Sequence, residues 1–180
     1  MSITQIKVVG FGGQGVVLTG TILGKAGALF DGQFATMIRS YGPEARGGAC
    51  SSQIIIADEP ITYPYVTQPD ILIALSQEAC ERYLSELSPN GTLLYESELV
   101  KPNRLPNGAK SFGIPCTRMA QEMGNRLVLN IMMLGCLAKI SSAISRQALE
   151  EAIRTSVPAK TIDLNLQAFN QGYDFLATGA

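Results

Sequence analysis

A glycine-rich stretch near the amino terminus is the first part of this 180-residue chain that could do chemistry. The stretch "VVGFGGQGVVLTG" has three glycines in the G-x-G-x-x-G spacing of dinucleotide-binding turns. Such a turn lets the backbone approach a phosphate, and the helix that follows offers free N–H groups to the anion. The residues that could contact an anion or cofactor here are Gly10, Gly12, Gly13, Gln14 and Gly15.

A dinucleotide site needs a second part, and this sequence lacks it. In NAD-binding folds an acidic residue near the end of the second strand holds the ribose hydroxyls. The second predicted strand ends "TMIRSYG" without an acid, and Asp31 precedes that strand at the opposite edge of the sheet. Arg39 and Ser40 could suit a 2′-phosphate, so a free-standing NADP-binding Rossmann-like protein stays as an alternative. In a purely structural interpretation, the glycines only let the helix pack closely on the strand.

A second glycine cluster, "SYGPEARGGA", follows the second predicted strand. If the turn before that strand is tight, this cluster lies at the same edge as the first turn, where open α/β sheets bind ligands. Arg46 stands between small residues, so its donors can reach an anionic group. The alternative is a surface loop in which Arg46 and Glu44 form a solvated pair of little energy. Arg46 is therefore a candidate contact for an anion or cofactor.

Few other residues could form a reactive group. The sequence has no histidine, which removes the commonest general base and the commonest zinc ligand. Cys50, Cys80, Cys116 and Cys136 are widely spaced and form no C-x-x-C motif. We therefore predict reduced core thiols, with no catalytic residue and no metal ligand in this chain.

Composition narrows the class of protein. Hydrophobic residues make up 46% of the chain and charged residues 16%, as in globular domains, and the net charge of −1 offers no basic surface for nucleic acid. The sequence has no apolar run of membrane-spanning length and no signal-like amino terminus. We expect a cytoplasmic protein that binds neither nucleic acid nor membrane.

Strands and helices alternate along the chain, which predicts an α/β fold with three layers, α/β/α, in a single domain over residues 1–180. Strands are predicted at residues 3–10, 33–40, 50–57, 70–75, 92–96 and near 110–112. Helices are predicted at about 15–30, 76–87, 117–124, 126–140, 145–155 and 159–175. No helix separates the second and third strands, so the sheet is expected to be mixed and mostly parallel. The fourth helix is apolar almost all round, and we expect its Asn130 to hydrogen-bond a neighbouring group.

The paired motifs resemble one family over nearly the whole chain. "GFGGQGVVLTG", "SYGPEARGGA" and "DEPITYP", with "LVLNIMMLG" and "NLQAFNQGYDF" near the carboxyl end, are similar to the gamma subunit of 2-oxoacid:ferredoxin oxidoreductases. The pyruvate branch tends to carry Arg in place of Phe11 and a different second motif. Phe11 and "PEARGGA" therefore favour the 2-oxoglutarate branch.

This resemblance implies a fold like the gamma domain, domain III, of pyruvate:ferredoxin oxidoreductase. It also implies an accessory subunit without a catalytic centre, in a complex that converts a 2-oxo acid and coenzyme A to acyl-CoA, carbon dioxide and reduced ferredoxin. The implied partners are alpha, beta and ferredoxin-like delta subunits, with ferredoxin as acceptor and a possible homodimer when the chain is isolated. Thiamine diphosphate, Mg and iron–sulfur clusters belong to the complex and not to this chain alone. Coenzyme A is the ligand whose phosphates the glycine segments could contact. The resemblance also implies that the second segment faces the partner subunits, through Tyr41, Pro43, Glu44, Arg46, Gly47 and Gly48.

Overall fold

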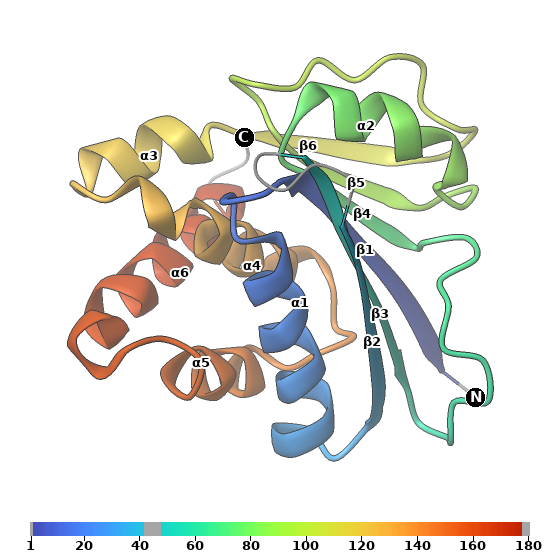
Figure 1. The fold of residues 1–180 in the computed structure, drawn as a ribbon, viewed down its shortest axis with the longest axis horizontal. Helices are drawn as coiled ribbons and strands as arrows, with labels where there is room; N and C mark the ends of the chain where they lie inside the picture. The colour runs from blue at the N-terminus through green and yellow to red at the C-terminus, as the bar shows by residue number, and fades with distance from the viewer. Residues whose placement is uncertain (1, 42–47, 178–180) are drawn as a thin grey trace.

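A computed structural model describes residues 2–41 and 48–177 of the chain. One six-stranded sheet runs through the molecule (Figure 1). Its strands are β1 (Ile3–Phe11), β2 (Phe34–Tyr41), β3 (Ala49–Ala57), β4 (Ile71–Ala74), β5 (Thr92–Glu96) and β6 (Lys110–Ile114). These bounds agree with the predicted strands to within a few residues.

Six α-helices surround the sheet, and each lies where the sequence predicts a helix. They are α1 (Val16–Lys25), α2 (Gln77–Tyr83), α3 (Cys116–Glu122), α4 (Leu129–Ile140), α5 (Arg146–Arg154) and α6 (Ile162–Ala177). Helix α1 continues as one π-helical turn over Ala26–Phe30. Two serines begin helices as predicted, because the Oγ atoms of Ser76 and Ser145 accept backbone N–H bonds from the first turns of α2 and α5.

The strand order is β2-β3-β1-β4-β5-β6. Strand β3 is antiparallel to both of its neighbours, β2 and β1, whereas β1, β4, β5 and β6 pair in parallel. All strands except β3 therefore point the same way, which confirms the predicted mixed, mostly parallel sheet. The second strand does not pair with the first, because β3 lies between them.

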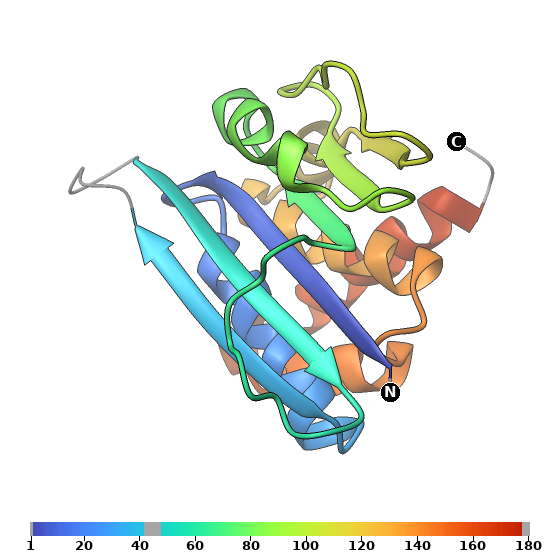
Figure 2. The same cartoon turned by 90° about the vertical axis from the view of Figure 1, so that its right-hand side faces the viewer.

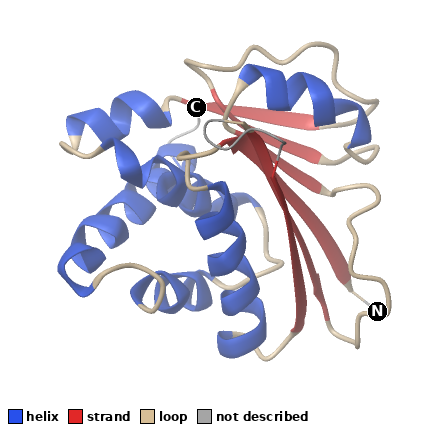
Figure 3. Cartoon of the chain, viewed as in Figure 1, coloured by secondary structure: helices blue, strands red, loops and turns tan. Residues whose placement is uncertain are grey.

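The two faces of the sheet are covered unequally. Helices α1, α3, α4, α5 and α6 lie on one face, and α2 lies on the other (Figures 1 and 3). The loop between β3 and β4 crosses the α2-side face of the antiparallel strands (Figure 2), where Gln53 and Gln5 accept backbone N–H bonds from it. Each face has its own cluster of buried apolar side chains, so the domain has the predicted three layers.

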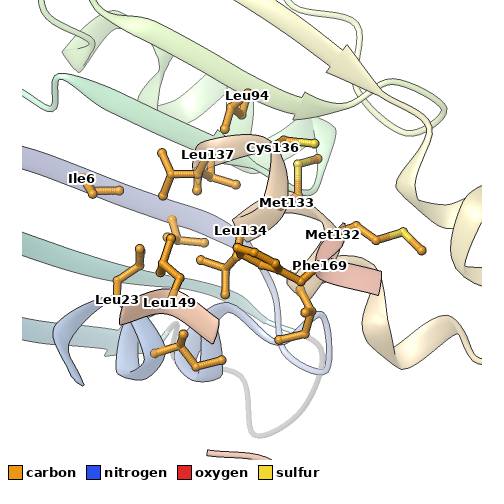
Figure 4. Close-up of a cluster of buried hydrophobic side chains, with 14 of the residues drawn as sticks. Ile6, Leu23, Leu94, Met132, Met133, Leu134, Cys136, Leu137, Leu149 and Phe169 are labelled. Carbon is orange, nitrogen blue, oxygen red and sulfur yellow. The ribbon is translucent and has the colours of Figure 1, made fainter. Parts of the chain in front are cut away.

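The larger apolar cluster packs the five helices on the sheet, and α4 runs through its middle. Seven consecutive residues of α4, from Ile131 to Leu137, are buried, so the helix is packed on most sides as predicted. Figure 4 shows its side chains between the sheet and Phe169 of α6. Helices α4 and α6 cross in close backbone contact, because a Cβ atom built on Gly135 would lie 2.0 Å from the carbonyl oxygen of Phe169.

Candidate functional site

The first glycine turn joins β1 to α1 at the carboxyl edge of the sheet, and its own residues hold its shape. The Gln14 side chain accepts a hydrogen bond from the Phe11 N–H (2.7 Å) and donates one to the Leu75 carbonyl (2.8 Å). A Cβ on Gly10 would meet the Gln14 Oε1 at 2.7 Å. Gly10 and Gln14 therefore close the turn and attach it to the end of β4, whether or not they also serve a ligand.

Helix α4 contacts the turn through the side chain of Asn130. Gly15 has a left-handed backbone with φ of +79°, and a Cβ there would lie 2.5 Å from the Asn130 Nδ2. Asn130 is only 1% exposed, and its amide donates to the Gly15 carbonyl (3.4 Å) and to the Thr19 Oγ1 (3.3 Å). The prediction that Asn130 bonds a neighbour is therefore confirmed. The same contacts explain why residue 15 must be glycine.

The two glycine segments meet at the same edge. The Gly12 N–H donates to the Gly48 carbonyl at 3.0 Å, which joins the first turn to the segment that leads into β3. Tyr41, at the end of β2, has 63% of its side chain exposed. The predicted interface residues Pro43, Glu44, Arg46 and Gly47 lie outside the described residues. Their roles, and the contact of Arg46 with an anion, stay predictions.

Gly13 is the part of the turn most open to a ligand. Its φ is +95°, and a Cβ built there would meet no atom within 4 Å. Gly12 beside it is also exposed. The first turn of α1 begins directly after Gly15, and helix geometry leaves its N–H groups without an internal acceptor. The Gly12 N–H is already bonded to the Gly48 carbonyl, so the backbone donors that an anion could reach are those of Gly13 and the start of α1. This is the chemistry that the sequence predicts for the turn.

The strand order argues against a dinucleotide site. In such a site the end of the second strand lies directly beside the first. Here β3 intervenes, so Arg39 and Ser40 at the end of β2 lie two strand spacings from β1, about 10 Å. Asp31 is at the amino edge and accepts bonds from the Ser145 N–H and Oγ, both at 2.6 Å. This carboxylate caps α5, and the ribose-binding arrangement does not form.

A crevice opens beside the turn, and sequence reasoning missed it. Phe11 and Gln14 line it from the β1 side, together with residues from the start of α2 and Leu99 from the loop after β5. The same crevice carries two exposed carboxylates, Glu78 and Glu81. Only the strand order reveals it, because the connections that follow β1 and β4 leave the sheet on opposite faces.

The cysteines behave as predicted, because all four are free and buried. Burial raises the pKa of the Cys136 thiol to about 12, and it raises the pKa of the Cys50, Cys80 and Cys116 thiols as well. At neutral pH these thiols are protonated and poor nucleophiles. Among residues 2–41 and 48–177, no three His, Cys, Asp or Glu side chains gather closely enough to hold a metal ion. None of the helices in this part of the chain is long and apolar enough to cross a bilayer.

Fold and site together define an α/β domain whose glycine turn is held in shape by its own residues and by the end of β4. Residues 5–175 match the family model for pyruvate ferredoxin/flavodoxin oxidoreductase. The chain is 44% identical over 172 residues to 2-oxoglutarate synthase subunit KorC of Methanocaldococcus jannaschii, covering 94% of this chain and 92% of that protein. This chain belongs to the pyruvate ferredoxin/flavodoxin oxidoreductase family.

Solved structures support the same placement. The gamma subunit of a keto/oxoacid ferredoxin oxidoreductase from Geobacter sulfurreducens superposes with a TM-score of 0.84 at 37% identity, over 95% of this chain and 96% of that one. A 2-oxoglutarate:ferredoxin oxidoreductase from Magnetococcus marinus shares the fold with a TM-score of 0.86 at 23% identity, where the whole of this chain covers 32% of the longer chain. The predicted resemblance to gamma subunits is confirmed, and so is the preference for the 2-oxoglutarate branch.

Proposed function

We propose that this chain is the gamma subunit of a 2-oxoglutarate:ferredoxin oxidoreductase. The complete enzyme would convert 2-oxoglutarate and coenzyme A to succinyl-CoA, carbon dioxide and reduced ferredoxin. The observation that carries this proposal is the similarity to 2-oxoglutarate synthase subunit KorC, at 44% identity over almost the full length of both chains.

The proposed role of the chain within the complex is binding and assembly, with the redox chemistry on the partner subunits. The chain has no histidine, and its described cysteines are buried thiols with raised pKa values. The side chains around the glycine turn are used within the fold, as Gln14 and Asn130 illustrate. Thiamine diphosphate, Mg and the iron–sulfur clusters would be held by alpha, beta and ferredoxin-like delta subunits, with ferredoxin as the electron acceptor.

Coenzyme A is the ligand proposed for the glycine turn. Its phosphates are anions, and the backbone around Gly12 and Gly13 is exposed beside the start of α1. The turn would then hold a phosphate by backbone donors and orient the thiol toward the partner subunits. Arg46 is proposed to add a charge-assisted contact to the same anion or to a partner subunit.

Reconstitution tests the function directly. The chain should co-purify with the alpha, beta and delta subunits, and the complex should reduce a viologen dye with 2-oxoglutarate and coenzyme A. A complex prepared without this chain should lose that activity or fail to assemble, while the isolated chain should be colourless and inactive. A stoichiometric iron content in the isolated chain, or a complex that is fully active without it, would contradict the proposal.

A matched pair of variants tests the coenzyme A contact. Gly13 and Gly32 both have a positive φ, and an added Cβ would meet nothing within 4 Å at either position. Gly13→Ala and Gly32→Ala therefore carry a similar backbone strain, but Gly32 lies at the opposite edge of the sheet, before β2. We expect Gly13→Ala alone to raise the apparent KM for coenzyme A. Equal KM values for coenzyme A in the two variants would contradict the proposal that the glycine turn contacts coenzyme A.

Arg46 is tested in the same complex. Arg46→Ala should weaken either assembly or coenzyme A use by one to two decades, since a charge-assisted bond contributes about 1.5–3 kcal/mol. A sizing column separates the two cases, because lost assembly changes the elution and a lost coenzyme A contact does not. Arg39→Ala, on the exposed end of β2, provides the control. Normal assembly and turnover of the Arg46 variant at low coenzyme A would contradict this role and favour the alternative, in which Arg46 and Glu44 form a solvated pair in a surface loop.

A further inference from the structure

We infer that the crevice between the ends of β1 and β4 receives an arginine side chain from a partner polypeptide. This inference rests on the proposed function, because it assigns the partner contact made at the carboxyl edge. The crevice lies at the point where the chain connections diverge. Strand β1 leads into α1 on one face of the sheet, and β4 leads into α2 on the other (Figure 1). Open α/β sheets bind their ligands at such points.

The lining of this crevice selects its occupant. Most of its surface is apolar, with Phe11 on one side and Leu99, whose side chain is 48% exposed, on the other. The carboxylates of Glu78 and Glu81 lie among the lining residues, and no lysine or arginine joins them there within the described part of the chain. Glu81 accepts a bond from the Gln77 amide at 2.7 Å, whereas Glu78 has no such bond among residues 2–41 and 48–177.

Charge excludes the ligand that the fold alone would suggest. A pyrophosphate placed in this crevice would face the carboxylates of Glu78 and Glu81, and no lysine or arginine among the described lining residues would balance their charge. Glu78, in the first turn of α2, also suits the helix dipole, and the two carboxylates by themselves would not make a site. Combined with apolar walls at a divergence point, however, they fit a long side chain with an apolar stem and a cationic head. Arginine matches best, because its flat guanidinium stacks on an aromatic face and can bond two carboxylates.

The partner is a protein chain because the crevice is continuous with the edge already proposed to face the other subunits. Phe11 and Gln14 belong to the first glycine turn, which Gly12 joins to Gly48 of the second segment. An arginine bound here would hold this subunit against its partner, since arginine is one of the residues that contribute most to the binding energy of protein interfaces. The turn would then serve two purposes, with backbone donors facing an anion and side chains facing the partner.

Charge reversal in the reconstituted complex tests the inference. Glu78→Lys should weaken the association of this chain with the other subunits by at least tenfold, and Glu78→Gln should weaken it less and reduce its dependence on salt. Glu122→Lys is the matched control, because Glu122 is also an exposed acid but lies on a different helix, α3. Thermal melts of the isolated variants confirm folding, and Glu78→Gln, which adds no charge, keeps the test valid if the lysine variant is unstable.

Each outcome decides the matter. Selective weakening by the Glu78 variants, with the Glu122 variant unchanged, supports the arginine contact. Unchanged association of Glu78→Lys, or equal weakening by Glu122→Lys, overturns it. Micromolar binding of NAD or NADP to the isolated chain, abolished by Phe11→Ala, would show a nucleotide as the occupant and also overturn it. If the wild-type chain does not assemble with the other subunits, the proposed function itself fails, and this result is distinct from the others.

Discussion

The crossing of α4 and α6 gives a sharp test of the packing, because two glycines allow it. A Cβ on Gly135 would lie 2.0 Å from the carbonyl oxygen of Phe169, and a Cβ on Gly172 would lie 2.0 Å from that of Met132. Ordinary van der Waals contact begins at 3.4 Å, so Gly135→Ala must separate the two helices by about 1.4 Å at this point. The obstacle is backbone, so no side-chain rotation can relieve the contact.

The cost of that separation follows from what the crossing buries. Phe169 and Met132 are fully buried there, and the Cys136 thiol bonds the Gly172 carbonyl at 3.1 Å. Overpacking costs about 1–3 kcal/mol or more, and loosened contacts around Phe169 add to that. Alanine returns up to about 1 kcal/mol through its higher helix propensity. We expect Gly135→Ala to lower the free energy of unfolding by about 1–3 kcal/mol, or the Tm by roughly 2–12 °C.

Gly24 provides the control for this experiment. It also lies inside a helix, α1, but its Cβ would meet only the Met37 Cβ at an ordinary 3.9 Å. Gly24→Ala should therefore stabilise the isolated chain by about 0.4–1 kcal/mol. Urea unfolding followed by circular dichroism measures both variants. A Gly135→Ala protein as stable as the wild type would refute the close crossing.

Three further predictions concern buried polar groups. Glu86→Gln leaves the Lys7 ammonium, which is 6% exposed, without its ionic partner, and should lower the free energy of unfolding in urea by about 1–3 kcal/mol. Lys7→Met should lower it less, because no buried charge is then left unpaired. Equal losses of stability in the two variants would contradict this prediction. Because burial raises the Cys136 pKa to about 12 from 9.0, the folded state holds that proton more tightly. Stability should therefore fall between about pH 9 and 12, and Cys136→Ala should flatten that decline; an unaltered slope would count against it. Asn130→Ala should lower the stability by about 1–3 kcal/mol in thermal melts, through lost support of the glycine turn; an unchanged Tm would argue against that support.

The elements of this fold could be predicted because their signals are local. Serine caps, apolar periodicity and turn glycines each depend on a few neighbouring residues, and Ser76 and Ser145 begin their helices as expected. The apolar character of residues 126–140 likewise predicts a helix packed on most sides. The close crossing could not be predicted from these signals, because Gly135 and Gly172 lie far apart in sequence and only the packed structure shows that their helices touch.

The candidate site was predicted in part. The spacing of the glycines placed the turn correctly between β1 and α1, and the second segment meets it through Gly48. The structural roles of the turn residues could not be predicted from the sequence, because Gln14 bonds Leu75 and Gly15 packs on Asn130, and both partners come from distant segments. The acidic crevice was missed for the same reason, since Glu78 and Phe11 share a surface only after β4 has paired with β1.

The insertion of β3 between β1 and β2 determines which strand end lies beside the glycine turn, and its cause lies in the strand compositions. Strand β3 carries Ile54, Ile55 and Ile56 in succession, all at most 2% exposed, as a strand covered on both faces requires. Strand β2 ends in Arg39-Ser40-Tyr41, all exposed, as an edge strand tolerates. The more apolar strand therefore takes the inner position, and the hairpin pairs with β1 through its second strand. This pairing moves the end of β2 away from the turn, so the ribose site of a dinucleotide fold cannot form. This edge is where we propose that a different anion and the partner chains bind.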